Sequence, residues 1–279
     1  MTEGHVIPPE AIAPMMRRLG LETVEALMLA LLPEAQALAR PPLSAFRVGA
    51  VGREAETGAL VMGANVEFLG ADLGETIHAE QFLFSRAFHR GATLDLIAVS
   101  ARPCGHCRQF MTEFAGRDRL MILDSGGDRL SLNTMLPFNF SPADLGETGA
   151  TAAIAHALPT VLTGDIAPAL LDALRVAGAR AHAPYSRSPS AVLLRLTDGT
   201  VITGSAIENA AYNPGLRPIQ SALINLIAAG RQYDEIDLGI LGSEAAGAID
   251  HAPGTARLLG LLAPHAGFDT VTWRSALSS

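Results

Sequence analysis

The stretch Pro42-Leu-Ser-Ala-Phe-Arg-Val-Gly49 has a counterpart 142 residues later, Pro184-Tyr-Ser-Arg-Ser-Pro-Ser-Ala191. A second pair follows at nearly the same spacing, because Gly63-Ala-Asn-Val-Glu67 is similar to Gly204-Ser-Ala-Ile-Glu208. Paired segments at a nearly fixed spacing are typical of an internal duplication. We therefore expect the chain to contain two copies of one fold.

The residues around the first segment alternate between strand and helix patterns. Residues 46–51 and 59–64 have strand character, and Thr57-Gly58 predicts the turn between them. The order strand, strand, helix, strand, helix, strand predicts a small α/β domain built in layers. The expected elements after the first hairpin are a helix at 78–89, a strand at 96–101, a helix opening at 103 and a strand at 120–123.

The regions on either side of this pattern set the expected domain boundaries. Apolar residues recur at helical spacing from Pro9 to Arg40, and Pro41-Pro42 ends that region because consecutive prolines cannot continue a helix. A mixture of Gly, Pro, Asp and Glu after residue 141 is typical of a linker. We predict a small helical N-terminal domain at 1–41, a first α/β domain at 42–140, a linker at 141–160 and a second α/β domain at 161–279.

Composition and charge argue against several classes of protein. Of the 279 residues, 49% are hydrophobic and 17% are charged, which allows a buried core. The net charge of -8 argues against a long nucleic acid partner, because basic patches bind a phosphate backbone. No apolar run reaches the ~18 residues of a membrane span, and the first residues lack the pattern of a signal peptide. We expect a cytoplasmic protein without nucleic acid or membrane partners.

Cys104 and Cys107 lie three residues apart and are the two cysteines of the chain. At the start of a helix this spacing turns both sulfurs toward one point, where Zn²⁺ can bind. The motif alone leaves open a redox pair or two buried cysteines. His78, 26 residues upstream of Cys104, offers a third ligand. His106 is an alternative ligand between the cysteines, but we expect it to point away from the metal.

Glu80 follows His78 by two residues, which completes a longer motif. The combination H-x-E followed by P-C-x-x-C is the signature of zinc deaminases. Three protein ligands leave the fourth zinc position open to water, as in catalytic sites. A carboxylate beside the metal can accept a proton and return it to a substrate. We predict His78, Cys104 and Cys107 as ligands and Glu80 as the catalytic acid and base.

With these residues the sequence resembles the cytidine deaminases, in particular the larger dimeric bacterial type. The resemblance rests on blocks such as Thr76-Ile-His-Ala-Glu-Gln81, Pro103-Cys-Gly-His-Cys-Arg-Gln-Phe-Met111 and Glu208-Asn-Ala-Ala-Tyr-Asn-Pro214. It implies a three-layer α/β/α fold present twice, as a catalytic and a degenerate copy, after a small helical domain. It also implies one Zn²⁺ per chain, a homodimer, and hydrolysis of cytidine and 2′-deoxycytidine to the uracil nucleoside and ammonia in pyrimidine salvage.

The resemblance further implies which residues bind the nucleoside. Asn65 and Glu67 would hold the ribose hydroxyls, and their spacing places both side chains on one face of a strand. Phe46 would pack on the pyrimidine ring, and the Ala79 backbone N–H would donate to the base carbonyl. Tyr212 would reach the site of the partner subunit. Many relatives have phenylalanine there, so its hydroxyl is a departure from the family.

The second copy lacks the chemistry of the first. It contains no cysteine, and matching the two copies places Pro218-Ile-Gln220 where the first has His78-Ala-Glu80. We therefore expect residues 161–279 to bind no metal, with Gln220 in the position of Glu80.

Two other functions use the same motif or metal. A nucleic-acid-editing deaminase shares the zinc signature, but it needs basic and aromatic contacts to flanking nucleotides. This chain is acidic and has 5% aromatic residues. A structural zinc protein needs a fourth protein ligand, and there is no third cysteine to supply it.

Overall fold

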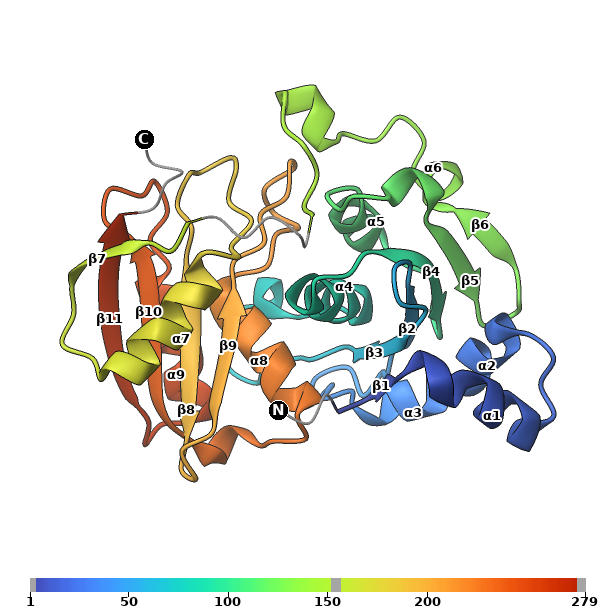
Figure 1. Ribbon diagram of the computed structural model, residues 1–279, viewed down its shortest axis with the longest axis horizontal. Coiled ribbons are helices and arrows are strands. Elements are labelled where there is room, and N and C mark those ends of the chain that lie inside the picture. Colours follow the sequence, from blue (N-terminus) through green and yellow to red (C-terminus); the bar gives the residue numbers. More distant parts are fainter. Residues whose placement is uncertain (1–3, 152–156, 275–279) are drawn as a thin grey trace. The chain divides into compact units, whose positions relative to one another are not determined.

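The chain divides into two units, residues 1–153 and 154–279, in a computed structural model that describes residues 4–151 and 157–274 (Figure 1). Each unit contains one mixed β-sheet with helices packed on it. Among the described residues, no helix is both long and apolar enough to span a membrane. The α/β class predicted from the sequence is confirmed.

A six-stranded sheet forms the centre of the first unit. Its strands are β1 (Val6–Ile7), β2 (Gly49–Glu54), β3 (Leu60–Ala64), β4 (Leu94–Val99), β5 (Met121–Asp124) and β6 (Arg129–Ser131). The order across the sheet is β1-β3-β2-β4-β5-β6, with β4 and β5 parallel and all other neighbours antiparallel. The parallel pair requires a crossover, which contains helix α5 (Gly105–Met111).

Helices cover both faces of this sheet. They are α1 (Pro9–Leu19), α2 (Val24–Ala30), α3 (Leu32–Ala37), α4 (Ala79–Arg90) and, after the sheet, α6 (Leu132–Met135). On one face, α4 approaches β3 so closely that a Cβ atom on Gly63 would lie 2.7 Å from the Leu83 backbone nitrogen. Met62, which precedes Gly63 in β3, points to the opposite face of the sheet. It packs in the buried cluster that contains Leu27 and Met28 of α2. The predicted three-layer arrangement is therefore confirmed.

The N-terminal helices share a hydrophobic core with the sheet. Leu27, Met28, Leu32 and Ala35 belong to the same buried cluster as Val51 of β2. Burial of this apolar surface fixes α2 and α3 on the sheet. Residues 1–41 as a domain of their own, and the other predicted boundaries, stay predictions.

A five-stranded sheet forms the centre of the second unit. Its strands are β7 (Thr160–Thr163), β8 (Ala191–Leu196), β9 (Val201–Ser205), β10 (Ile236–Glu244) and β11 (Gly267–Arg274), and its helices are α7 (Pro168–Gly178), α8 (Pro218–Ala228) and α9 (Ala252–Leu262). The order is β7-β11-β10-β8-β9, with β10 and β11 parallel. Leu174 of α7 packs with Trp273 on one face. On the other face, a Cβ atom on Gly204 would overlap the backbone of Ala222 in α8. Short 3-10 turns complete both units, at Leu73–Glu75, Arg117–Arg119, Pro142–Leu145 and Tyr233–Glu235.

The strand registers show the internal duplication at the level of residues. Gly49 pairs with Ala64 across β2 and β3, and Ala191 pairs with Ser205 across β8 and β9. These are the same positions of the two repeated segments. The two sheets therefore begin from equivalent hairpins.

The helix that follows each hairpin corrects the sequence alignment of the two copies. The Gln81 side-chain oxygen accepts a hydrogen bond from the His78 backbone N–H at 3.0 Å, and the Gln220 oxygen accepts one from the Arg217 backbone N–H at 2.9 Å. Gln220 is thus the counterpart of Gln81, and its predicted correspondence to Glu80 is wrong by one residue. The physical reason is the preceding loop, which is two residues shorter in the second unit.

With this corrected alignment, Arg217 takes the place of His78 and Ile219 takes the place of Glu80. Ile219 is 1% exposed and has no group that can exchange a proton. The second unit therefore lacks the carboxylate as well as the cysteines of the first.

Candidate active site

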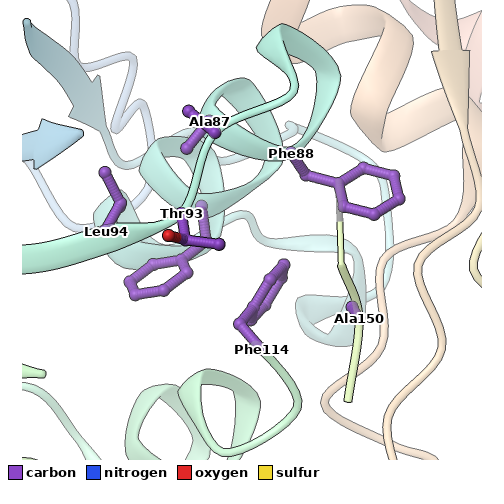
Figure 2. Close-up of a pocket in the computed structure, with 8 residues that line it drawn as sticks. Ala87, Phe88, Thr93, Leu94, Phe114 and Ala150 are labelled. Atoms are coloured by element: carbon purple, nitrogen blue, oxygen red, sulfur yellow. The ribbon is translucent and has the colours of Figure 1, made fainter. Parts of the chain in front are cut away.

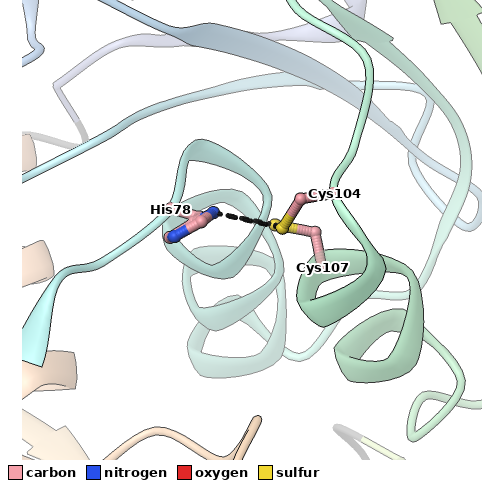
Figure 3. A group of neighbouring side chains, drawn as sticks. All are labelled: His78, Cys104 and Cys107. Atoms are coloured by element: carbon pink, nitrogen blue, oxygen red, sulfur yellow. Dashed lines mark hydrogen bonds between the residues drawn. The ribbon is translucent and has the colours of Figure 1, made fainter. Parts of the chain in front are cut away.

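His78, Cys104 and Cys107 bring their potential ligand atoms within 4.8 Å of one another (Figure 3). The Cys107 Sγ lies 3.2 Å from the His78 Nδ1, and the Cys104 Sγ lies 3.6 Å from both the Cys107 Sγ and that same nitrogen. His78 is the N-cap residue of α4, and Cys104 is the N-cap residue of α5. Two helix starts therefore meet at one point.

This donor set fits a zinc ion. Ligands at about 2.0–2.3 Å in a tetrahedron are separated from one another by roughly 3.3–3.8 Å, which matches the spacing of these three atoms. The N-terminus of α5 favours the thiolate form, because its free N–H groups and dipole attract negative charge. A hydrogen bond from Cys107 lowers the pKa of the Cys104 thiol to about 4. The three residues therefore suit a tetrahedral Zn²⁺ with one further position.

Glu80 contacts this group from the first turn of α4. Its Oε2 lies 3.2 Å from the Cys107 Sγ, and its side chain is 3% exposed. Burial raises the pKa of the Glu80 carboxyl. A buried carboxyl beside a metal site, with its pKa raised above its usual range, is suited to taking up and releasing a proton.

His106 lies outside the ligand group, although it stands between the two cysteines. Its ring stacks on that of His78, with centroids 5.6 Å apart and planes inclined by 13°. Its Nε2 lies 3.3 Å from the Gln81 Nε2. Sequence reasoning missed Gln81, because a glutamine in a helix carries no chemical signal of its own.

Glu67 holds the loop that precedes β2. Its Oε2 accepts hydrogen bonds from the backbone N–H groups of Leu43 and Ser44, both at 2.9 Å, and its Oε1 accepts one from the Ser44 hydroxyl at 2.5 Å. These bonds lower the pKa of the Glu67 carboxyl, against the effect of desolvation. Glu67 is therefore an anionic anchor for this loop.

Phe46 follows in the same loop and is held at both of its peptide groups. Its N–H donates to the Ser44 hydroxyl at 3.0 Å, and its carbonyl oxygen accepts from the Asn65 Nδ2 at 2.9 Å. Its side chain is 61% exposed. The loop contacts move the start of the strand predicted at 46–51 to Gly49. Ser44 was also missed, although its repetition as Ser186 in the second of the two repeated segments is a signal in the sequence.

Two further predicted residues lie in different settings. Ala79 is the first residue of α4 and is buried, at a position where backbone N–H groups have no partner within the helix. Tyr212, in the second unit, is 68% exposed and adopts a positive φ of 64°. Its predicted place in the site of a partner subunit stays a prediction.

A separate apolar hollow lies beside α4 in the first unit (Figure 2). Of its lining residues, Thr93 has a polar side chain, and that hydroxyl donates to the Glu56 carboxylate. The hollow therefore has no converging polar groups for a nucleoside. It is lined by Phe84, Ala87, Phe88, Ala92, Thr93, Leu94, Phe114 and Ala150.

The chain is similar to known protein families and to a solved structure. Two family models described as the cytidine and deoxycytidylate deaminase zinc-binding region match residues 21–123 and 132–256. A crystal structure of a cytidine deaminase from Mycobacterium tuberculosis is 30% identical, with a TM-score of 0.38, and the match covers 43% of this chain and 99% of that chain.

Two relatives match over most of their length. A cytidine deaminase of Vibrio atlanticus is 42% identical over 260 residues, which cover 92% of this chain and 86% of the relative. One from Klebsiella pneumoniae is 42% identical over 262 residues, which cover 93% and 87%. With this identity along nearly the whole chain, and with a zinc-type His/Cys/Cys group beside a buried glutamate, the chain belongs to the cytidine deaminase family.

Proposed function

We propose that this protein hydrolyses cytidine and 2′-deoxycytidine to the corresponding uracil nucleoside and ammonia. The observation that carries the proposal is the buried Glu80 carboxyl in contact with Cys107, within a group of three zinc-type ligands. The reaction breaks the bond between C4 and the exocyclic nitrogen and forms a bond between C4 and the oxygen of water. It places the enzyme in pyrimidine salvage.

His78, Cys104 and Cys107 hold one Zn²⁺ per chain in this proposal. When bound, the ion makes water more acidic and so supplies a nucleophile near neutral pH. Glu80 accepts a proton from the attacking water and delivers it to N3 of the base, which makes C4 electrophilic. It then carries a proton to the leaving amino group, so that one carboxyl acts first as a base and then as an acid.

Loop and strand residues of the first unit bind the nucleoside. Phe46, exposed and fixed at both peptide groups, packs on the pyrimidine ring. Asn65 and Glu67 bind the ribose hydroxyls, since an amide and a carboxylate have more donor and acceptor positions than their contacts to the loop occupy. The N–H of Ala79 donates to the base carbonyl. Together these groups recognise a ribose and one base.

The larger assembly follows from the family type. We propose a cytoplasmic homodimer in which Tyr212 of the partner subunit covers the nucleoside. The organisation comprises a helical region at 1–41, a catalytic domain at 42–140, a linker at 141–160 and a degenerate domain at 161–279. The net charge of -8 supports a free nucleoside over a nucleic acid strand as substrate.

A substrate panel tests this function. Ammonia release is measured with cytidine, 2′-deoxycytidine, free cytosine and a cytosine-containing single-stranded oligonucleotide. We expect rapid release from the two nucleosides and little from cytosine, which lacks the ribose that Asn65 and Glu67 bind. Release from the oligonucleotide at a rate similar to cytidine would favour a nucleic-acid-editing deaminase, and no release from any of the four, with Zn²⁺ bound, would leave a structural zinc protein.

A further inference from the structure

The imidazole of His106 covers one face of the His78 ring. The centroid distance of 5.6 Å and the interplanar angle of 13° lie in the range of offset-stacked aromatic pairs. His106 is exposed to solvent and is not one of the three residues whose ligand atoms converge. It therefore contacts the expected zinc ligand without being a ligand.

Gln81 connects this ring to the start of α4. Its Oε1 accepts from the His78 backbone N–H at 3.0 Å, and its Nε2 lies 3.3 Å from the His106 Nε2. The first contact determines which end of the amide is the oxygen, so the amide nitrogen faces His106 and donates to its Nε2. The Gln81 side chain is 2% exposed. A buried amide thus joins the helix start that carries His78 to the one that carries the cysteines.

The second unit has the first of these two Gln81 contacts and lacks the second, because it has no cysteines and so no histidine between them. Gln220 makes the same backbone contact, from its Oε1 to the Arg217 N–H at 2.9 Å, in a unit without cysteines. The contact that caps the helix therefore belongs to the repeated fold. The contact to a histidine between two cysteines belongs to the first unit, where the zinc ligands are.

We propose that Gln81 and His106 form a positioning pair for the metal ligand His78. Stacking fixes the plane of the His78 imidazole, and the amide bridge fixes the spacing between α4 and α5, so that the Nδ1 atom of His78 faces both sulfurs. Partners of this kind around a metal-binding histidine typically change metal affinity by about 10- to 100-fold when they are removed. The proposal rests on the proposed role of His78 as a zinc ligand.

The test measures how fast zinc leaves the protein. Zinc-loaded wild type, H106A, Q81A and the double variant are mixed with an excess of a chromogenic chelator, and the release rate is recorded. We expect each single variant to release zinc about 10-fold faster or more. The double variant should be no faster than the faster single variant, because the two residues act as one unit. Q220A is the matched control, since it removes the same helix cap in the second unit, and it should release zinc at the wild-type rate.

Several results would overturn the proposal. The first is that H106A releases zinc at the wild-type rate. The second is that the double variant's acceleration equals the product of the two single-variant accelerations. The third is that Q220A releases zinc as fast as Q81A, which would indicate general destabilisation. The visible spectrum of the Co²⁺-substituted protein gives a second readout, because it reports ligand geometry, and it should change in H106A and not in Q220A. If H106A does not fold, H106F takes its place, since it keeps a ring and removes the nitrogen that Gln81 contacts.

The outcomes also separate this proposal from the proposed function. A wild-type protein that binds no zinc would overturn the ligand assignment and this proposal together. A wild-type protein that binds zinc but does not deaminate cytidine would overturn the proposed substrate alone, because zinc release involves no nucleoside.

Discussion

Glu80 combines burial with contact to a cysteine of the proposed metal site. Its side chain is 3% exposed and its oxygen lies 3.2 Å from the Cys107 sulfur. The H-x-E spacing at a helix start was enough to predict the position of this carboxyl in the first turn beside the N-cap histidine, and its role as acid and base stays a prediction. Its contact partner was not predictable, since it depends on how α4 and α5 pack.

Glu80→Gln tests the proton transfer at this residue. The amide has nearly the same shape and cannot take up the proton, so we expect cytidine turnover to fall by about 10²- to 10⁴-fold while the zinc content stays at the wild-type level. Turnover and bound zinc are measured on the same preparation. Glu56→Gln is the control, because Glu56 binds Thr93 away from the site, and it should retain activity. Wild-type turnover in E80Q would exclude Glu80 as the proton carrier.

His251 gives the second unit a dependence on acid. Burial, and then the positive charge of Arg217, lower its pKa from 6.5 to about 4. Between pH 6.5 and pH 4, the unfolded chain takes up a proton at His251 that the folded chain does not. The free energy of unfolding therefore falls as the pH drops from about 6.5 toward 4. Above pH 6.5 this histidine does not affect it. The loss is about 3 kcal/mol. Thermal melts of wild type and H251N from pH 7 to pH 4.5 should show a shallower acid loss in H251N, and identical slopes would contradict this.

At the scale of elements, close approach of α4 to the sheet fixes the position of His78. A Cβ atom on Gly63 would lie 2.7 Å from both the Ala79 carbonyl oxygen and the Leu83 backbone nitrogen. Backbone atoms of a packed helix cannot move aside as a flexible side chain can. The first turn of α4, with His78 before it, therefore depends on a glycine in β3.

Gly63→Ala should displace α4 and weaken the metal site together with the fold. Overpacking of this kind costs about 1–3 kcal/mol in the free energy of unfolding. We expect a lower melting temperature and faster zinc release. Gly260→Ala is the control. This glycine lies inside α9, and a Cβ atom added there would meet nothing within 4 Å. It should raise the free energy of unfolding by about 0.5–1 kcal/mol, as a helix favours alanine. Unchanged stability in G63A would show that the helix can shift without loss.

The loop at 41–46 explains why part of the strand pattern was misleading. Residues 46–48 have the composition of a strand, yet β2 begins at Gly49. The cause is the Asn65 amide, which binds the Phe46 carbonyl oxygen and the Val48 N–H from 17 or more residues away in the sequence. Local patterns predict local conformation, and they do not include a contact over that distance.

Ser44→Ala should loosen this loop and weaken nucleoside binding. It removes the hydroxyl that donates to Glu67 and accepts from the Phe46 N–H. We expect KM for cytidine to rise about 10-fold with a smaller change in kcat, because the contacts proposed for Phe46 and Glu67 are made to substrate and transition state alike. Ser186→Ala breaks the equivalent contact to Glu208 in the second unit and should leave KM within about twofold. Equal KM in S44A and wild type would mean that the loop is held without Ser44.

At the scale of the whole molecule, the duplication joins one unit that has the His/Cys/Cys group to one that has no cysteine. The repeated segments and the missing cysteines were enough to predict this division. They were not enough to align the helix starts, where a loop two residues shorter places Ile219, and not Gln220, opposite Glu80. A deletion inside an irregular loop leaves no periodic pattern to count. The capping contact of Gln220 resolves the alignment because it fixes the position of the helix start.

In the proposed reaction, one metal centre in the first unit carries the activity. The most direct measurement strips the protein of metal with a chelator, returns Zn²⁺ in known steps, and follows the ultraviolet absorbance of cytidine after each step. We expect activity to rise in proportion to zinc and to reach its plateau at one equivalent per chain. A plateau at two equivalents, or cytidine turnover in the metal-free protein, would show that the activity does not depend on a single metal centre.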